Sequence, residues 1–292
     1  MPRRTPEEEE KVAEARQAVK LLKSPNENVR WEAVKRLGEM KHVSTVPALA
    51  KALRDPNKEV RMMAADALRW IGNARAVPAL GKALKDPEPE VQSRVASALG
   101  NLKHPSAVPY LVKLVHDPNP ERRWNIMSAL GRIGHESALP SLVEALQDSH
   151  SGVRSSAVQA LGEIEHPRVV PNLITLLFQD LSLGVRLNAA EALGKIGHED
   201  AVVALANLLH HSNPDMQKNT AVALGRIGRA IQGRKVKRKE AQALQLVGAY
   251  FNEDEAGTTV RKAYEAALKG KVTEKNARLF VKQLRALKGS VK

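Results

Sequence analysis

The chain has 292 residues, of which 43% are apolar but only 3% are aromatic, and it contains no cysteine. The lack of cysteine excludes disulfide bonds and cysteine-ligated zinc, and it fits a reducing compartment. No apolar run approaches the roughly 20 residues of a membrane span, and the N-terminal segment has no apolar signal-peptide core. We therefore expect a soluble, cytoplasmic protein with no membrane partner.

The positive charge is concentrated near the C-terminus. The net charge is +14, and residues 229–292 hold 16 Lys/Arg against 6 Asp/Glu, a net charge of +10. A basic region beside a nearly neutral one favours an anionic partner, which could be a nucleic acid, a ribonucleoprotein or an acidic protein. The alternative is a lysine-rich surface that only keeps the protein soluble.

A unit of 31 residues recurs over residues 11–228, after a charged tail predicted for residues 1–10. The steps between equivalent positions are 31 residues, with one step of 32. The reference positions are Val29, Val60, Val91, Arg122, Val153, Val185 and Met216. A fixed period of this length is typical of a solenoid, in which each unit buries its apolar face against its neighbours.

Each unit is predicted to form two helices. The first has a proline in its opening turn, where the missing N–H costs nothing, and we expect Ser44, Ser106, Ser137 and Asp200 to cap it. The second is rich in alanine and should form the inner, concave wall. Glycine is expected to end several second helices in a left-handed conformation. These predicted C-caps are Gly72, Gly134, Gly197 and Gly228. A further glycine column one turn earlier implies a close helix contact.

Residues 229–292 depart from the period. We predict a basic insertion, then a degenerate eighth unit with helices over about 237–251 and 260–268, and finally a capping helix over about 273–287. Solenoids need such caps because the last unit otherwise exposes an apolar face.

The second helices carry a pattern, Asp-x4-Val-Arg-x2-Ala-x2-Ala-Leu-Gly-x-Ile-Gly, which residues 180–197 match. This pattern resembles the HEAT-repeat superfamily, most closely the short repeats named after phycobilisome lyases. The resemblance implies an all-α, right-handed α–α superhelix, here with about seven regular helix pairs. It leaves function open, because that superfamily includes scaffolds, lyase subunits and enzymes.

Two columns of polar residues are interpreted as structural. The arginine column, which includes Arg61 and Arg154, is predicted to pair with an aspartate six residues earlier in the same unit, although it could present charge to a ligand. The histidine column occupies the loops between units, and its members are His42, His104, His135, His166 and His198, with Asn73 in one place. Units about 10 Å apart cannot share one zinc ion, whose nitrogen ligands lie about 2.0–2.1 Å away. A weaker possibility is that these loops bind a phosphate backbone.

Large and basic side chains at exposed positions of the second helices are predicted to line a partner-binding groove. Exposed tryptophan with nearby arginine is typical of binding surfaces. The predicted groove residues are Trp31, Met62, Met63, Arg69, Trp70, Arg94, Trp124, Arg132, Leu187, Lys195 and Arg226. The alternative is that each tryptophan fills a local gap between units.

A second predicted site is an anion-binding segment in the insertion. Its residues are Arg229, Arg234, Lys235, Lys237, Arg238 and Lys239. We expect no metal, cofactor or catalytic residue. Deoxyhypusine hydroxylase, also a HEAT-like protein, holds iron with His-Glu pairs on helices, but here only His135-Glu136 and His198-Glu199 occur, both in predicted loops.

These patterns favour a non-catalytic scaffold that binds a protein or ribonucleoprotein through the groove and the basic C-terminal region. Direct nucleic-acid binding is the first alternative. A bilin-lyase-like subunit or a metal-dependent hydroxylase is the second.

Overall fold

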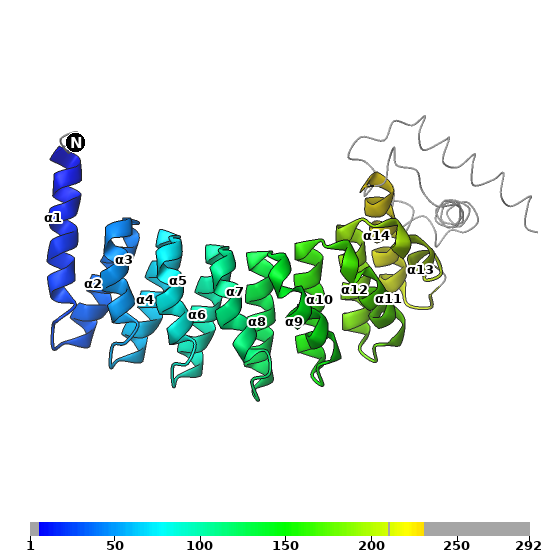
Figure 1. Cartoon of the computed structure of the whole chain (residues 1–292), viewed down its shortest axis with the longest axis horizontal. Coiled ribbons are helices and arrows are strands. Elements are labelled where there is room, and N and C mark those ends of the chain that lie inside the picture. Colours follow the sequence, from blue (N-terminus) through cyan, green and yellow to red (C-terminus); the bar gives the residue numbers. More distant parts are fainter. Residues whose placement is uncertain (1–5, 210, 231–292) are drawn as a thin grey trace, which may run out of the picture. The chain divides into compact units, whose positions relative to one another are not determined.

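The computed structural model describes residues 6–209 and 211–230, and within these ranges the chain is helical and contains no strand. Consecutive helices form seven pairs, as the period predicts (Figure 1). Contacts divide the chain into two units, residues 1–141 (unit 1) and 142–292 (unit 2), and the boundary falls within α9. The predicted helices beyond residue 230 lie outside the described residues.

The first helices of the pairs are α1 (Pro6–Leu21), α3 (Val46–Ala52), α5 (Val77–Ala83), α7 (Val108–Leu111), α9 (Leu139–Glu144), α11 (Val170–Gln179) and α13 (Val202–Ala206). The second helices are α2 (Glu27–Glu39), α4 (Lys58–Ile71), α6 (Pro89–Leu102), α8 (Pro120–Ile133), α10 (Ser151–Ile164), α12 (Leu183–Ile196) and α14 (Pro214–Ala230). Short 3-10 helices flank the first helices, namely η1 (Val43–Thr45), η2 (Ala74–Ala76), η3 (Pro105–Ala107), η4 (Val112–Leu114), η5 (Glu136–Ala138), η6 (Ala145–Gln147), η7 (Pro167–Val169) and η8 (Glu199–Ala201).

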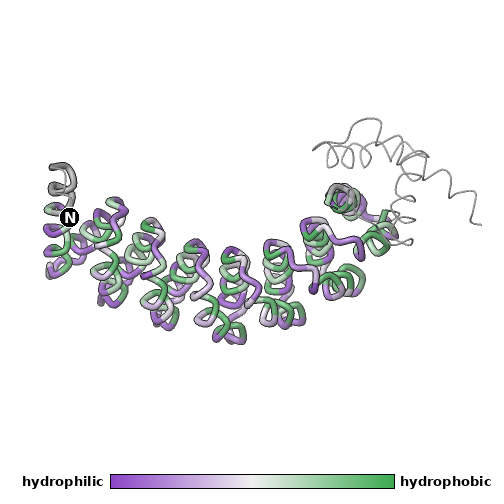
Figure 2. The backbone as a smooth tube through the Cα atoms, turned by 45° about the horizontal axis from the view of Figure 1, so that its top comes forward, coloured by the Kyte–Doolittle hydropathy of each residue, from purple (hydrophilic) through white to green (hydrophobic). Residues whose placement is uncertain are grey.

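The second helices pack in sequence, α2–α4–α6–α8 in unit 1 and α10–α12–α14 in unit 2. The first helices α1, α3, α5, α7, α11 and α13 pack against the second helices of their own pairs, and η6 packs against α10. Hydrophobic residues occupy one side of the helices and hydrophilic residues the other (Figure 2). The buried sides meet in a core of aliphatic residues such as Leu49, Leu68, Leu80 and Leu99, none of which is accessible. Since each pair buries these residues against its neighbours, the fold needs no central core.

The glycine column allows the second helices to approach closely, as predicted. A Cβ atom added to Gly38 would lie 2.6 Å from the Cβ of Ala67, and one added to Gly194 would lie 2.6 Å from the Cα of Ala223. Real Cβ atoms do not approach so closely. A side chain at Gly38 would therefore push α2 away from α4, and one at Gly194 would push α12 away from α14.

The arginine column pairs with a different aspartate from the one predicted. Arg61 donates to the carboxylate of Asp86, 25 residues later in the next pair, at 2.7 and 2.9 Å. Its other guanidinium nitrogen donates to the carbonyl of Asp55, 2.9 Å away in its own turn. The prediction of an ion pair inside each unit is therefore wrong for this arginine. One side chain joins two repeats, because the guanidinium reaches both the turn beneath it and the turn of the next pair.

The same bridge recurs in both units. Arg30 donates to Asp55 and Arg154 donates to Asp180, each through two hydrogen bonds of 2.7–2.9 Å. The hydrogen bonds from Arg154 lower the pKa of Asp180 below its ordinary value, although burial acts in the opposite direction. We call this set of inter-repeat bridges the arginine ladder.

The histidine column supplies the N-caps that the sequence assigned to serine and aspartate. The Nδ1 atoms of His42, His104 and His135 accept hydrogen bonds from backbone N–H groups two residues later, at 3.2–3.3 Å. His166 and His198 do the same, and Asn73 uses its side-chain oxygen. The predicted cap Ser106 instead places its hydroxyl 2.8 Å from the imidazole of His104. An acceptor two residues before the N–H fits the tight 3-10 turn.

Two helix boundaries differ from the predictions. The left-handed C-caps at Gly72, Gly134 and Gly197 are confirmed, but Gly228 lies inside α14 rather than at its end. At the N-terminus, α1 begins at Pro6, within the segment predicted as a tail, because proline suits the first position of a helix and the following glutamates favour its positive end.

Candidate functional site

The eleven predicted groove residues all remain accessible on second helices. Eight lie in unit 1 and three, Leu187, Lys195 and Arg226, lie in unit 2. Trp124, Arg94 and Arg132 are exposed and the other eight are partly exposed. We call the accessible side of these helices the second-helix face.

The three tryptophans differ in their environments. Trp124 on α8 has 45% of its surface exposed. Trp70 is partly buried, and its ring would contact a Cβ added to Gly38 at 2.9 Å, so it fills part of the space between α2 and α4. Trp31 is also partly buried, and the ammonium of Lys35 lies 5.6 Å from its ring centroid. Trp70 therefore fits the gap-filling alternative, whereas Trp124 is the most exposed of the three.

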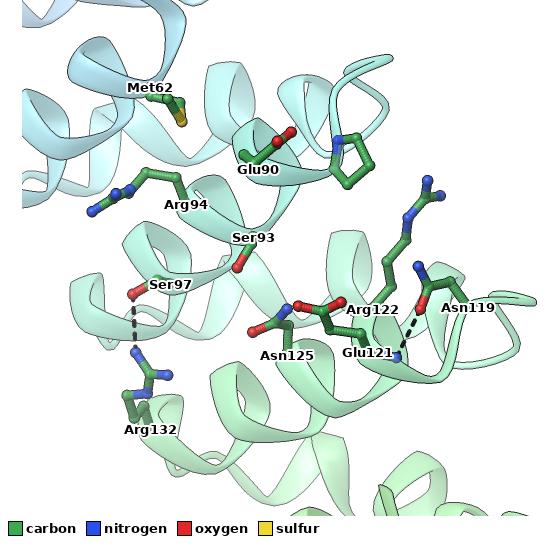
Figure 3. Close-up of a pocket in the computed structure, with 11 residues that line it drawn as sticks. Met62, Glu90, Ser93, Arg94, Ser97, Asn119, Glu121, Arg122, Asn125 and Arg132 are labelled. Carbon is green, nitrogen blue, oxygen red and sulfur yellow. Dashed lines mark hydrogen bonds between the residues drawn. The ribbon is translucent and has the colours of Figure 1, made fainter. Parts of the chain in front are cut away.

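A cavity of about 740 Å³ lies on the second-helix face of unit 1, over α4, α6 and α8 (Figure 3). It brings together three predicted groove residues, Met62, Arg94 and Arg132. The lining also includes residues outside the predicted groove set, namely Pro89, Glu90, Ser93, Ser97, Asn119, Glu121, Arg122 and Asn125. Of the tryptophans, none lines this cavity.

Arginines at one end of the cavity outnumber their carboxylate partners. Asp66, which is 8% exposed, accepts from Arg69 at 3.0 Å and pairs with Arg94 at 3.3 Å, so two guanidinium groups share one carboxylate. Arg132 donates to the hydroxyls of Ser97 and Ser128, at 3.2 and 2.9 Å. Neutral hydroxyls position this cation without compensating its charge.

Arg122 is the lining residue that the sequence could have revealed. It occupies the repeat position that valine fills at 60, 91, 153 and 185, where the side chain is at most 1% exposed. Its Nη1 donates to the Asp117 carboxylate at 3.1 Å, whereas its Nε is buried and has no partner among the described residues. Aligning the repeat units shows this departure directly, because a charged residue then stands in a column of valines.

In unit 2, the predicted groove residue Lys195 forms ion pairs with two carboxylates. Its ammonium lies 2.6 Å from Glu163 and 3.5 Å from Glu191. The hydrogen bond with Glu163 raises the pKa of Lys195 above its ordinary value, so the side chain stays charged. This ion pair joins α10 to α12 and leaves Lys195 less available to a partner than Arg132.

Of the predicted anion-binding residues, Arg229 lies in the last turn of α14. The other five, Arg234, Lys235, Lys237, Arg238 and Lys239, lie outside the described residues.

Two kinds of feature are absent from residues 6–209 and 211–230. No three or more His, Asp or Glu side chains gather there in a way that could hold a metal ion. No helix in these ranges has the length and apolarity needed to cross a membrane.

A stack of helix pairs with an accessible row of second helices defines a helical repeat protein. The sequence model of HEAT repeats matches residues 15–86, 77–162, 144–225 and 170–269. The chain therefore belongs to the HEAT-repeat family, which confirms the resemblance seen in the sequence. No curated protein matches the sequence.

Several solved structures are similar to this chain. YibA of E. coli is 18% identical, covers 91% of this chain and 98% of its own, and superposes with a TM-score of 0.52, which shows a shared fold. The complex of CpcE and CpcF of phycocyanin lyase from Nostoc sp. PCC7120 is 25% identical, with coverage of 86% and 96% and a TM-score of 0.45. Human deoxyhypusine hydroxylase in complex with glycerol is 24% identical, with coverage of 90% and 97% and a TM-score of 0.42.

Proposed function

We propose that this protein is a non-catalytic scaffold that holds a protein partner on its second-helix face. The observation that carries the proposal is that the large and basic side chains of this face remain accessible, with Trp124 45% exposed. Tryptophan, methionine and arginine are enriched in the centres of protein interfaces, because they bury much surface while also forming polar contacts. The basic segment 229–292 would add contacts to an anionic surface, as on a ribonucleoprotein.

The proposal is tested by affinity capture from native lysate with the full chain, with and without nuclease. Trp124→Ala combined with Met62→Ala removes apolar contacts from the second-helix face of unit 1. Lys51→Ala combined with Lys82→Ala is the matched control, because these exposed lysines lie on first helices. We expect a nuclease-resistant partner whose recovery falls at least tenfold with the first pair and is unchanged with the second.

Two results would contradict the proposal, and the second would establish a different function. Equal recovery with both variant pairs would exclude the second-helix face as the binding surface. Capture that is abolished by nuclease and reduced by neutralising Lys235, Lys237, Arg238 and Lys239 would instead establish direct nucleic-acid binding, which weakens steeply with salt.

A further inference from the structure

The interface between α6 and α8 is where the repeat departs most from its own pattern. Gln92 occupies the ladder position held by Arg61 in the preceding pair, and Arg122 occupies the buried valine position. Gln92 still donates to the carbonyl of Asp86 in its own turn, but the described residues contain no ladder bridge from α6 to the next pair. Asp117, which stands 25 residues after Gln92 and would accept a ladder bridge from an arginine there, instead accepts a hydrogen bond from Arg122 of its own repeat.

These departures cost stability. A buried polar atom without a hydrogen bond is destabilising because it loses its contact with water and gains no other, and the Nε of Arg122 is such an atom among the described residues. The interface also gives up the bridge that stabilises the α2–α4 and α4–α6 interfaces. A local break in an otherwise consistent pattern, made at a cost in stability, is typical of a functional site.

The cavity described above lies over this same interface and has two unlike ends. Figure 3 places Arg94, Ser97 and Arg132 together at one end, whereas Glu90, Glu121 and Arg122 line the part of the cavity away from them. At the first end, Arg132 forms no ion pair with a carboxylate of the described residues, and Arg94 shares Asp66 with Arg69. Such an end suits a carboxylate, because guanidinium groups bind carboxylates through paired, charge-assisted hydrogen bonds.

The rest of the lining suits a peptide better than a nucleic acid. Ser93 and Asn125 lie between the two ends and can bond to peptide N–H and C=O groups, and Met62 offers an apolar contact. A continuous phosphate backbone would bring negative charge against Glu121 and against Glu90, whose exposed ion pair with Lys58 at 3.7 Å offsets its charge only in part, and this opposes binding. An acidic side chain on a peptide places its charge at one end only.

We propose, on the basis of the scaffold function above, that the α4–α6–α8 cavity binds an acidic segment of the partner protein. A Glu or Asp carboxylate of that segment lies against Arg132, Ser97 and Arg94. The proposal specifies an acidic partner segment and the part of the second-helix face that binds it.

The test uses the full chain labelled with ¹³C in its methionine methyl groups. Met62 lines the cavity, and Met216, fully buried in unit 2, is an internal reference. The probes are the capped peptide Ala-Ser-Glu-Asp-Ser-Ala, its counterpart with Gln and Asn in place of Glu and Asp, and a ten-residue oligouridine. NMR titration detects binding even when it is weak, and Met62→Leu assigns the signal.

We expect the acidic peptide to shift the Met62 signal and not that of Met216, and the amide counterpart to bind at least tenfold more weakly. Arg132→Gln should weaken the acidic peptide at least tenfold. Arg75→Gln, at an exposed position of η2, is the matched control and should bind as the original chain does. Thermal unfolding checks that both variants are folded.

The proposal is overturned if the Met62 signal does not move, if Arg132→Gln binds the acidic peptide unchanged, or if oligouridine binds more tightly than the peptide at this site. Failure here is separable from failure of the scaffold function. A nuclease-resistant lysate partner that depends on Trp124 but not on Arg132 would retain the scaffold and overturn only the carboxylate site.

Discussion

The arginine ladder is incomplete between α12 and α14, and a single substitution should complete it. Arg186 has a buried Nε without a partner among the described residues. His211 stands 25 residues later, where Asp86 stands relative to Arg61. Its Nδ1 accepts the N–H of Asn213 at 3.0 Å, which is the turn contact that aspartate makes elsewhere in the ladder. His211→Asp should keep that contact and add a carboxylate for Arg186.

The gain follows from the complete bridge of unit 2. There, Arg154 donates to Asp180 at 2.7 and 2.9 Å, and the aspartate side chain is only 3% exposed. Two charge-assisted hydrogen bonds in this setting, less the cost of removing the new carboxylate from water, should contribute about 1–2 kcal/mol. Part of the desolvation cost is already present because the Nε of Arg186 is buried. A change of this size raises the Tm by roughly 2–4 °C.

Thermal unfolding followed by circular dichroism measures the effect, and two controls isolate its cause. His211→Asn keeps a turn acceptor without adding charge, and Arg186→Gln removes the guanidinium. A double-mutant cycle should show that His211→Asp stabilises only when Arg186 is present. A gain that is equal for Asp and Asn, or that persists beside Arg186→Gln, would refute the bridge as its source.

The remaining predictions concern the ladder, the glycine column, the caps and the α6–α8 interface. The pKa of Asp180 is lowered in the folded state, so the ionised carboxylate stabilises the fold above its unfolded-state pKa of about 3.9. This stabilisation is lost as the pH falls below that value. Asp180→Asn should therefore lower the Tm at pH 7 and flatten the acid side of a curve of Tm against pH. Gly194→Ala should destabilise by about 1–3 kcal/mol in denaturant titration, since the new Cβ meets backbone of α14, and an unchanged midpoint would contradict this contact. His104→Ala should cost about 1 kcal/mol of unfolding free energy whereas His104→Asn should be nearly neutral, as asparagine makes the same cap in the third repeat. Gln92→Arg combined with Arg122→Val restores the repeat pattern and should raise the Tm; a Tm below that of the original chain would show that the fold requires Arg122.

The period alone was enough to predict the helix pairs, because every unit repeats the same apolar positions, prolines and glycines. It could not decide the partner of the ladder arginines. In a 31-residue repeat, an aspartate six residues before Arg61 and one 25 residues after it are members of the same column. Only the three-dimensional stacking shows that the side chain reaches forward to Asp86 while its own turn supplies carbonyl groups.

The caps and the site were less predictable for different reasons. Ser106 and His104 are both acceptors near the same turn, and general preferences favour serine, but the 3-10 geometry selects the residue two positions before the N–H. The cavity depends on Ser93 and Asn125, small polar residues that are ordinary on any helix surface. Arg94 and Arg132 could be predicted as accessible, but not that a cavity would bring them together.

Comparing the repeats of one chain separates positions that serve the fold from positions that serve something else. The ladder is missing from the α6–α8 and the α12–α14 interfaces, and both leave an arginine Nε buried without a partner among the described residues. At α12–α14, His211 keeps the turn contact and differs from the pattern only in lacking charge. At α6–α8, by contrast, Gln92 and Arg122 change together, under a cavity lined by Arg132, which forms no ion pair with a carboxylate of the described residues. Repairing the first interface should therefore bring stability alone, whereas the second is the interface at which we propose that stability has been exchanged for recognition.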